Sequence, residues 1–321
     1  METVRTDISA FAEKIQQLRN QIATVVVGQE RTVDLILAAI LAEGHVLLEG
    51  VPGVAKTLMA RTVSRLIDAQ FGRIQFTPDL MPSNVLGTMV FNMKSGEFQF
   101  HKGPVFADVI LVDEINRAPA KTQAALFEVM QERQVTIDTN TYPMNPVFTI
   151  IATQNPVEQE GTYKLPEAQL DRFIMKINVG YPSPQEEFEV LYRHNGNNAF
   201  DQLSGIKPVV SIEELTAMRG MLSHVVVEQS LMQYIVSIVH STRNSRHIFL
   251  GASPRASVAL MQTSKALALL QGRDFVTPDD IQFLAYPVLC HRLILSTEAE
   301  LDGMTIPKVI QTLISQIEVP K

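Results

Sequence analysis

The chain has 321 residues and a mass of 35.7 kDa, which exceeds one ordinary hydrophobic core and predicts two domains. Its net charge of −7 argues against broad binding to the phosphate backbone of nucleic acids. The single cysteine, Cys290, excludes an internal disulfide. The longest apolar run, Leu35–Ala42, is far shorter than the roughly 20 residues needed to cross a bilayer. Because the N-terminus also lacks a secretion signal, the sequence predicts a cytoplasmic protein without a membrane span.

The first part of the chain, residues 1–183, combines helical and strand patterns. Apolar residues recur at helical spacing from Ile8 to Ile22, and the pattern returns over Arg31–Ala42. Five short apolar runs then alternate with helical segments such as Lys56–Asp68 and Thr122–Glu132. Continuous apolar strands separated by helices are typical of a parallel sheet that helices cover on both faces, so we predict an α/β fold. The expected strands are His45–Glu49, Arg73–Phe76, Val109–Val112, Val147–Ala152 and Phe173–Ile177.

Two strand–turn–strand patterns interrupt this alternation and predict hairpins. The first pairs Met89–Asn92 with Phe98–His101, and the second pairs Gln134–Ile137 with Thr141–Met144. Both are insertions into an otherwise regular series of helices and strands.

Strand patterns nearly vanish after residue 183, so we place a domain boundary there and predict an all-helical domain over residues 184–321. At Ser253 and Thr277, a hydroxyl residue followed by proline predicts a helix start that the hydroxyl caps. The expected helices are Gln185–His194, Ile212–Leu222, Gln229–Thr242, Pro254–Leu270, Pro278–Leu289 and Pro307–Ile317.

A glycine-rich segment, GVPGVAKT, connects the first expected strand to the helix that follows it. This is the context of a phosphate-binding loop, in which glycines let successive N–H groups converge on phosphate oxygens at a helix N-terminus. We expect Lys56 to reach the β- and γ-phosphates of ATP and Thr57 to offer its hydroxyl to Mg²⁺. Ala55 stands where glycine is usual, which is harmless if its φ angle is negative. The expected nucleotide-binding residues here are Gly50, Val51, Pro52, Gly53, Val54, Ala55, Lys56, Thr57 and Leu58.

Two acids, Asp113 and Glu114, end the buried strand that begins at Val109. Ligands of α/β folds lie at the carboxyl ends of the strands. Asp113 suits the coordination sphere of Mg²⁺, and Glu114 suits a base that orients the attacking water. Two acids at a strand end are by themselves common, so it is the phosphate loop upstream that favours the catalytic interpretation.

Six segments in one order resemble the MoxR family of AAA+ ATPases: GVPGVAKT, FTPDLMPSNVLG, VDEINRAP, ATQNP, LPEAQLDRF and GASPRA. The resemblance extends over roughly residues 20–295. It implies a three-layer αβα domain with a parallel five-stranded sheet, a small helical lid, and a homo-oligomeric ring that is commonly a hexamer. The two hairpins then correspond to the helix-2 insert and the pre-sensor-1 insert. The implied role is chaperone-like, often assisting metal or cofactor insertion or the maturation of a partner complex.

The resemblance also implies roles for three polar residues. Asn155 matches the sensor-1 position, Arg172 the arginine finger that reaches a neighbour's nucleotide, and Arg255 the sensor-2 arginine that contacts the γ-phosphate and ties the lid angle to the nucleotide state. Arg255 lies in the first turn of a helix, where a cation opposes the helix dipole, which favours an anionic partner. The alternatives are a simple turn at Asn155, a surface ion pair at Arg172 and a solvated side chain at Arg255.

Weaker signals surround these positions. Val27 and Gly28 resemble the segment that packs on adenine, although a turn between two helices explains them equally well. Lys164 departs from the family pattern, in which proline is expected, and leaves the conformation of that loop open.

The sequence therefore predicts an enzyme that hydrolyses ATP with Mg²⁺ and remodels or activates a protein client. One alternative is a nucleotide-dependent switch with little turnover. A nucleic-acid motor is disfavoured, because the hairpin turns offer only Lys94 beside Glu97 in the first and Asp138 without a cation in the second.

Overall fold

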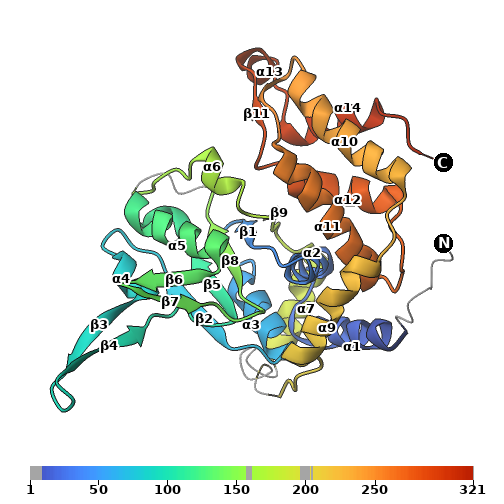
Figure 1. The fold of residues 1–321 in the computed structure, drawn as a ribbon. Helices are drawn as coiled ribbons and strands as arrows, with labels where there is room; N and C mark the ends of the chain where they lie inside the picture. The colour runs from blue at the N-terminus through green and yellow to red at the C-terminus, as the bar shows by residue number, and fades with distance from the viewer. Residues whose placement is uncertain (1–8, 157–160, 196–202, 204, 321) are drawn as a thin grey trace.

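The computed structural model describes residues 9–156, 161–195, 203 and 205–320, so Ile8 lies outside it. A five-stranded sheet forms the centre of the first part of the chain, in the order β2-β5-β8-β1-β9 (Figure 1). All neighbouring strands pair in parallel, which confirms the predicted sheet. The strands are β1 (Val46–Glu49), β2 (Phe71–Gln75), β5 (Val109–Asp113), β8 (Thr149–Gln154) and β9 (Met175–Asn178).

Helices cover both faces of the sheet and make three layers. Successive residues of a strand point to opposite faces, and here both directions are buried: Val46 and Leu48 belong to one apolar cluster and Leu47 to the other. This explains why the strands read as continuous apolar runs. One face carries α1 (Ser9–Val25), α2 (Glu30–Leu41) and α3 (Lys56–Leu66), and the other carries α4 (Pro82–Leu86) and α5 (Ala120–Glu132).

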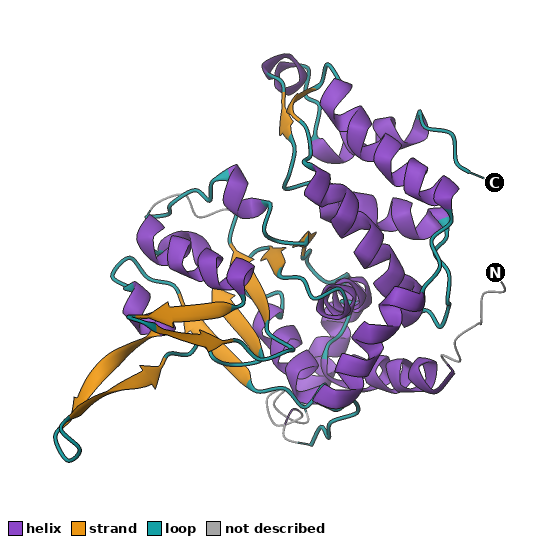
Figure 2. Cartoon of the chain, viewed as in Figure 1, coloured by secondary structure: helices purple, strands orange, loops and turns teal. Residues whose placement is uncertain are grey.

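Both predicted hairpins are confirmed. They consist of β3 (Gly87–Asn92) with β4 (Glu97–Lys102), and β6 (Gln134–Ile137) with β7 (Asn140–Pro143). The β3–β4 hairpin extends away from the sheet as a long arm (Figure 2).

The C-terminal part is helical, as predicted. A short antiparallel pair, β10 (Ile248–Leu250) with β11 (Ile294–Leu295), is an addition that the sequence pattern did not predict because each strand is so brief. Its helices are α7 (Pro184–His194), α9 (Ile212–Met221), α10 (Gln229–Asn244), α11 (Pro254–Leu270), α12 (Pro278–Leu289), α13 (Thr297–Leu301) and α14 (Ile306–Ser315), with a 3₁₀ turn at Leu222–His224. The first part also has the short helix α6 (Glu167–Leu170) and a 3₁₀ turn at Ile115–Arg117. Within the described residues, no helix is both long and apolar enough to cross a membrane.

Helices α7 and α9 lie beside α1 and α3 in Figure 1, whereas α10–α14 form a second stack, in which α11 packs against α2. Arg219 of α9 is anchored on α2, where its Nε donates to the carbonyl of Ile40 at 3.0 Å. The apolar cluster on this face continues from α1 and α2 into α11 and α12. The domain boundary near residue 183 therefore stays a prediction, because buried contacts cross it.

The two predicted caps differ. The Thr277 hydroxyl accepts a hydrogen bond from the backbone N–H of Asp280 at 3.4 Å and caps α12 as expected. Ser253 occupies the N-cap position of α11 but makes no side-chain cap, so that expectation is wrong. Its hydroxyl instead donates to Asp171, 3.0 Å away.

His45, directly before β1, is a buried neutral imidazole. Its Nδ1 accepts from the N–H of Ile150 at 3.0 Å, and its Nε2 lies 3.1 Å from the carbonyl of Met130, to which it donates in this tautomer. Burial, the largest effect, lowers the pKa of His45 from 6.5 to about 4. Below pH 6.5 the unfolded chain therefore takes up a proton that the folded protein resists.

We expect His45 to make the free energy of unfolding fall as the pH drops from 6.5 toward 4. At about 1.4 kcal/mol per pKa unit, the total loss is roughly 3 kcal/mol. Urea unfolding at neutral and acidic pH measures it, with His45→Gln expected to flatten the pH dependence and the exposed His101→Gln expected to leave it unchanged. An equal slope in all three proteins would contradict this assignment.

Candidate active site

The segment between β1 and α3 adopts the geometry of a phosphate loop. A Cβ at Gly50 would lie 2.5 Å from the carbonyl oxygen of Val179, so only glycine fits beside the end of β9. Gly53 has a φ of +88°, and a Cβ there would meet nothing within 4 Å, so this turn of backbone is open on one side. The loop thus combines a tight base with an accessible N-terminus of α3, the arrangement that attracts anions.

Ala55 corrects one expectation. Its φ is +61°, in the left-handed region, so the condition under which alanine would be harmless here, a negative φ, is not met. An L-residue with a Cβ pays a steric penalty of about 1 kcal/mol there that glycine avoids.

We expect Ala55→Gly to raise the free energy of unfolding by about 0.5–1 kcal/mol, because it relieves this strain. Urea denaturation measures the change. The matched control is Ala60→Gly in the middle of α3, where glycine is unfavourable and should cost about 1 kcal/mol or more. Destabilisation by both substitutions would show that the Ala55 backbone is not strained.

Lys56 lies at the first position of α3 and turns back over the loop, where its Nζ donates to the carbonyl of Gly50 at 2.5 Å. Burial lowers the pKa of Lys56, and the carboxylates of Asp113, Glu114 and Glu49 counteract this effect. The lysine of the loop and the two acids that end β5 thus lie close enough to interact. The structure brings these predicted residues together at the carboxyl ends of β1 and β5.

The two acids are held by different partners. Asp113 is almost fully buried and forms an ion pair with Arg73 of β2 at 2.7 Å, while the Thr153 hydroxyl donates to its Oδ1 at 3.3 Å. Glu114 accepts from Gln75 Nε2 at 2.9 Å.

Glu114 also pairs with Arg117 at 3.0 Å. The φ of Glu114, +56°, lies in the left-handed region, and such backbone strain concentrates at functional sites. The sequence pattern did not identify Arg73 and Gln75 of β2 as partners of these acids, because the polar residues of this strand match no motif.

The donors at this end of the sheet suit Mg²⁺. A threonine hydroxyl and a carboxylate, supplied by Thr57 and Asp113, are the hard oxygen donors that Mg²⁺ prefers, and the cation usually keeps several waters besides. Asp113 already neutralises one cation, Arg73, in this structure, which shows that a positive charge is accommodated there.

Asn155 follows β8 and is buried, between the ends of the strands that carry the loop and the acids. Its position directly beyond β8 is that expected for a residue near the phosphates. The preceding residue, Gln154, accepts a hydrogen bond through its carbonyl from the N–H of Gly50 at 3.3 Å, which ties the end of β8 to the loop.

A pocket of about 410 Å³ adjoins the phosphate loop, within the size range of small-molecule sites. From the predicted set, Val27, Pro52, Gly53, Val54, Ala55 and Leu58 line it. Gly28 supplies the turn beside it rather than its wall: its φ is +70°, and a Cβ would lie 2.4 Å from Glu186 of α7.

The far wall of the pocket comes from residues that the sequence analysis missed. Tyr181 and Pro182 precede α7, and Glu187, Val190 and Arg193 belong to it. Arg193 Nη1 donates to the carbonyls of Ala23 and Thr24 at the end of α1, at 2.9 and 2.8 Å. The sequence pattern did not identify these residues, because they belong to none of the six motifs.

Arg172 and Arg255 lie elsewhere. Strands β1 and β9 run parallel, with Glu49 opposite Asn178, so the phosphate loop follows one end while Arg172 precedes the other. The paired strands alone span roughly 10 Å. The guanidinium of Arg172 donates to the carbonyl of Phe127 in α5.

Arg255 is exposed in the first turn of α11, two residues beyond Ser253, whose hydroxyl bonds Asp171 next to Arg172. Ser253 therefore links the start of the helix that carries Arg255 to the residue next to Arg172. The role of Arg255 at the γ-phosphate stays a prediction.

Known proteins match this arrangement. Residues 45–175 match the family model for the ATPase family associated with various cellular activities (AAA), and residues 240–313 match the AAA lid domain. The chain is 42% identical to Chaperone MoxR1 of Mycobacterium tuberculosis, over 98% of this chain and 84% of that protein. The chain belongs to the MoxR family of AAA+ ATPases.

Two further similarities support the family assignment. YeaC of Bacillus subtilis is 47% identical over 92% of each chain. A crystal structure from Cytophaga hutchinsonii, of a protein named as a candidate ATPase, superimposes with a TM-score of 0.90 at 43% identity and covers 98% of this chain and 97% of that one. In this MoxR-family chain the AAA match contains the phosphate loop and both acids, and the lid match contains Arg255.

Proposed function

We propose that the chain binds ATP with its adenine in the pocket of about 410 Å³ and its phosphates on Gly50–Thr57, and hydrolyses it with Mg²⁺. One observation carries this proposal: Lys56, in the loop after β1, lies within electrostatic reach of Asp113 and Glu114 at the carboxyl end of β5, with β8 between these two strands of one parallel sheet. A lysine, a metal-binding carboxylate and a base are the groups that phosphoryl transfer requires. Membership of an ATPase family supports the same conclusion.

Each residue then has a chemical task. The N–H groups of the loop and the Lys56 ammonium stabilise charge on the phosphates, and Glu114 accepts the proton of the attacking water. The buried amide of Asn155 orients that water without adding charge. Thr57 and Asp113 would hold Mg²⁺, which, when bound, neutralises negative charge on the phosphate oxygens.

The position of Arg172 and Arg255 supports a ring in which both arginines serve a neighbour's nucleotide. They lie at the end of the sheet away from their own phosphate loop, so an intact site needs a second subunit. We propose a homo-oligomer, and a hexamer in particular. A cation supplied in trans stabilises the transferring phosphoryl group and makes hydrolysis depend on assembly.

The cellular role that we propose is chaperone-like remodelling or activation of a protein client, including metal or cofactor insertion or complex maturation. Its support is the name of a relative, Chaperone MoxR1. The cytoplasmic location and the absence of a nucleic-acid partner stay predictions from the sequence.

A nucleotide-dependent switch with little turnover is the second candidate, and one observation favours it. Arg73 pairs with Asp113, and Gln75 and Arg117 engage Glu114, so both acids must exchange partners before they can act on a nucleotide.

Phosphate release from ATP separates the two candidates. We expect turnover that requires Mg²⁺ and stops when EDTA removes it. Tight ATP binding with phosphate release at the background rate, in the assembled protein with Mg²⁺, would favour the switch instead.

A further inference from the structure

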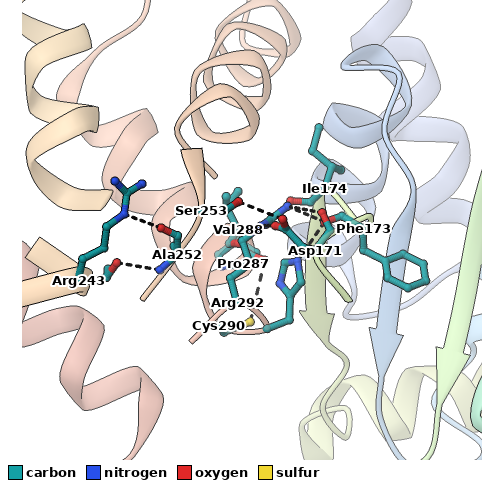
Figure 3. A network of polar contacts seen from close by, with 12 residues as sticks. Asp171, Phe173, Ile174, Arg243, Ala252, Ser253, Pro287, Val288, Cys290 and Arg292 are labelled. Atoms are coloured by element: carbon teal, nitrogen blue, oxygen red, sulfur yellow. Dashed lines mark hydrogen bonds and ion pairs between the residues drawn. The ribbon is translucent and has the colours of Figure 1, made fainter. Parts of the chain in front are cut away.

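One buried guanidinium of the lid binds the segment around Arg172 in its own chain. We call this segment, Asp171–Ile174, the finger segment. Arg292, just beyond α12, has a side chain that is only 3% exposed, and its Nε pairs with Asp171 Oδ1 at 2.7 Å (Figure 3). Its Nη2 donates to the carbonyl of Phe173 at 2.8 Å, and its Nη1 to that of Ile174 at 3.2 Å. One side chain of the lid therefore binds residues on both sides of Arg172.

Asp171 uses its second oxygen on another lid helix. The hydroxyl of Ser253 donates to Asp171 Oδ2 at 3.0 Å and forgoes the cap of α11, which its position would otherwise allow. The carboxylate next to Arg172 thus joins the end of α12 to the start of α11, the helix that carries Arg255. Because Ser253 makes this contact in place of a cap, the link is more than a by-product of helix packing.

Helix α12 also reaches the other end of β9, near the phosphate loop. The hydroxyl of Tyr286 accepts from Asn178 Nδ2 at 2.8 Å, and the Cys290 thiol lies 3.7 Å from the carbonyl of Lys176. Lys176 in turn pairs with Glu49, the residue before Gly50, at 2.7 Å. The helix therefore spans β9 from the base of the phosphate loop to the finger segment.

We propose that the Asp171–Arg292 pair is a positioning device for Arg172, through which the lid of one subunit sets the finger that acts on the next subunit's nucleotide. This inference rests on the proposed function, since it assumes that Arg172 acts in trans. A forked guanidinium held by a carboxylate and carbonyls is more rigid than a single hydrogen bond. It fixes the backbone on both sides of Arg172, and small displacements of a catalytic group are costly to rate.

The test uses Asp171→Asn, which keeps the shape of the side chain but removes its charge. We expect kcat for ATP to fall at least about ten-fold while the Kd for ATP changes less than about two-fold. Mixing with Lys56→Ala subunits then distinguishes positioning from general damage. In mixed rings each Lys56→Ala subunit supplies an intact finger to an Asp171→Asn neighbour whose phosphate loop is intact, so turnover should recover above the sum of the two separate proteins.

Two further variants complete the test, one as a control and one as a substitute. Asp280→Asn weakens an ion pair with Arg273, 2.7 Å long, at the opposite end of α12. Because this pair does not touch the finger segment, the variant should keep kcat within about two-fold of the wild type. Ser253→Ala removes only one hydroxyl from Asp171 and should reproduce a smaller loss of kcat with the same recovery, so it replaces Asp171→Asn if that variant does not fold.

Arg172→Ala, mixed with Lys56→Ala in the same way, is the reference variant. Comparing its turnover with that of Asp171→Asn separates the failure of this inference from the failure of the proposed function. If Arg172→Ala recovers on mixing while Asp171→Asn keeps wild-type kcat, or loses it without recovery, the inference is overturned and the proposed function stands. If Arg172→Ala itself turns over at the wild-type rate, this inference and the proposed trans role of Arg172 are both overturned, while the proposed hydrolysis of ATP stands.

Discussion

Replacing Glu114 with glutamine is expected to lower the turnover of ATP by about 10²–10⁴-fold and to leave the affinity for ATP within about two-fold. The amide cannot accept the proton of the attacking water, but it keeps the size of the side chain and can still bond Gln75, its partner at 2.9 Å. Phosphate release at saturating ATP measures turnover, and calorimetry measures affinity.

The control for this substitution is Glu97→Gln in the exposed β3–β4 hairpin, which removes the same charge far from the loop. It should retain wild-type turnover. Equal, substantial phosphate release by Glu114→Gln and wild type would remove Glu114 from the role of base. Because the variant should hold ATP without hydrolysing it, it is also the form with which to capture a protein client.

Replacing Arg172 with alanine is expected to lower turnover by about 10³-fold or more in the assembled protein, without loss of ATP binding. Arg172 precedes the end of β9 that lies away from its own phosphate loop, so in the proposed ring its effect would pass between subunits. Its Nε is buried without a hydrogen-bond partner among the described residues, which leaves the side chain incompletely satisfied on its own subunit.

Dilution provides the second measurement for Arg172. Turnover per chain of the wild type should fall as the ring dissociates, whereas Arg172→Ala should be low at every concentration. The exposed Arg246→Ala serves as the control for loss of a surface cation and should behave as wild type. A dilute monomer that hydrolyses ATP at full rate and is indifferent to Arg172→Ala would contradict the trans assignment.

The sheet and the phosphate loop were predictable because their signals are local. Each buried strand reads as a short apolar run, and GVPGVAKT lies between the first run and a helix, so periodicity and composition suffice. Strand ends shifted by at most two residues, as for β8, where the structure begins at Thr149 rather than Val147. Such shifts leave the polar residues at the carboxyl ends unchanged.

The remainder of the site depends on contacts between distant segments. The pocket wall formed by Tyr181 and Arg193 belongs to no motif and becomes visible only when α7 packs against the end of α1. The positive φ of Ala55 is imposed by the loop, against the preference of alanine.

Tertiary contacts also decide where two lid residues act. The sequence predicted a cap at Ser253 from local propensity, but Asp171 lies close enough to take its hydroxyl. The helix dipole and the family resemblance both predict that Arg255 meets an anion, and neither says what lies around it in the fold. Its location beside the finger segment follows from the packing of α12 along β9, which no local pattern encodes.

The most direct measurement is calorimetric titration of the folded protein with ATP and Mg²⁺, beside Lys56→Ala as the matched variant. We expect saturable binding by the wild type and a loss of affinity of at least about ten-fold when the ammonium that faces the phosphates is removed. Circular dichroism should show that both proteins are equally folded. Absence of binding by the well-folded wild type, or equal affinity in the two proteins, would contradict the assignment of this loop as the nucleotide site.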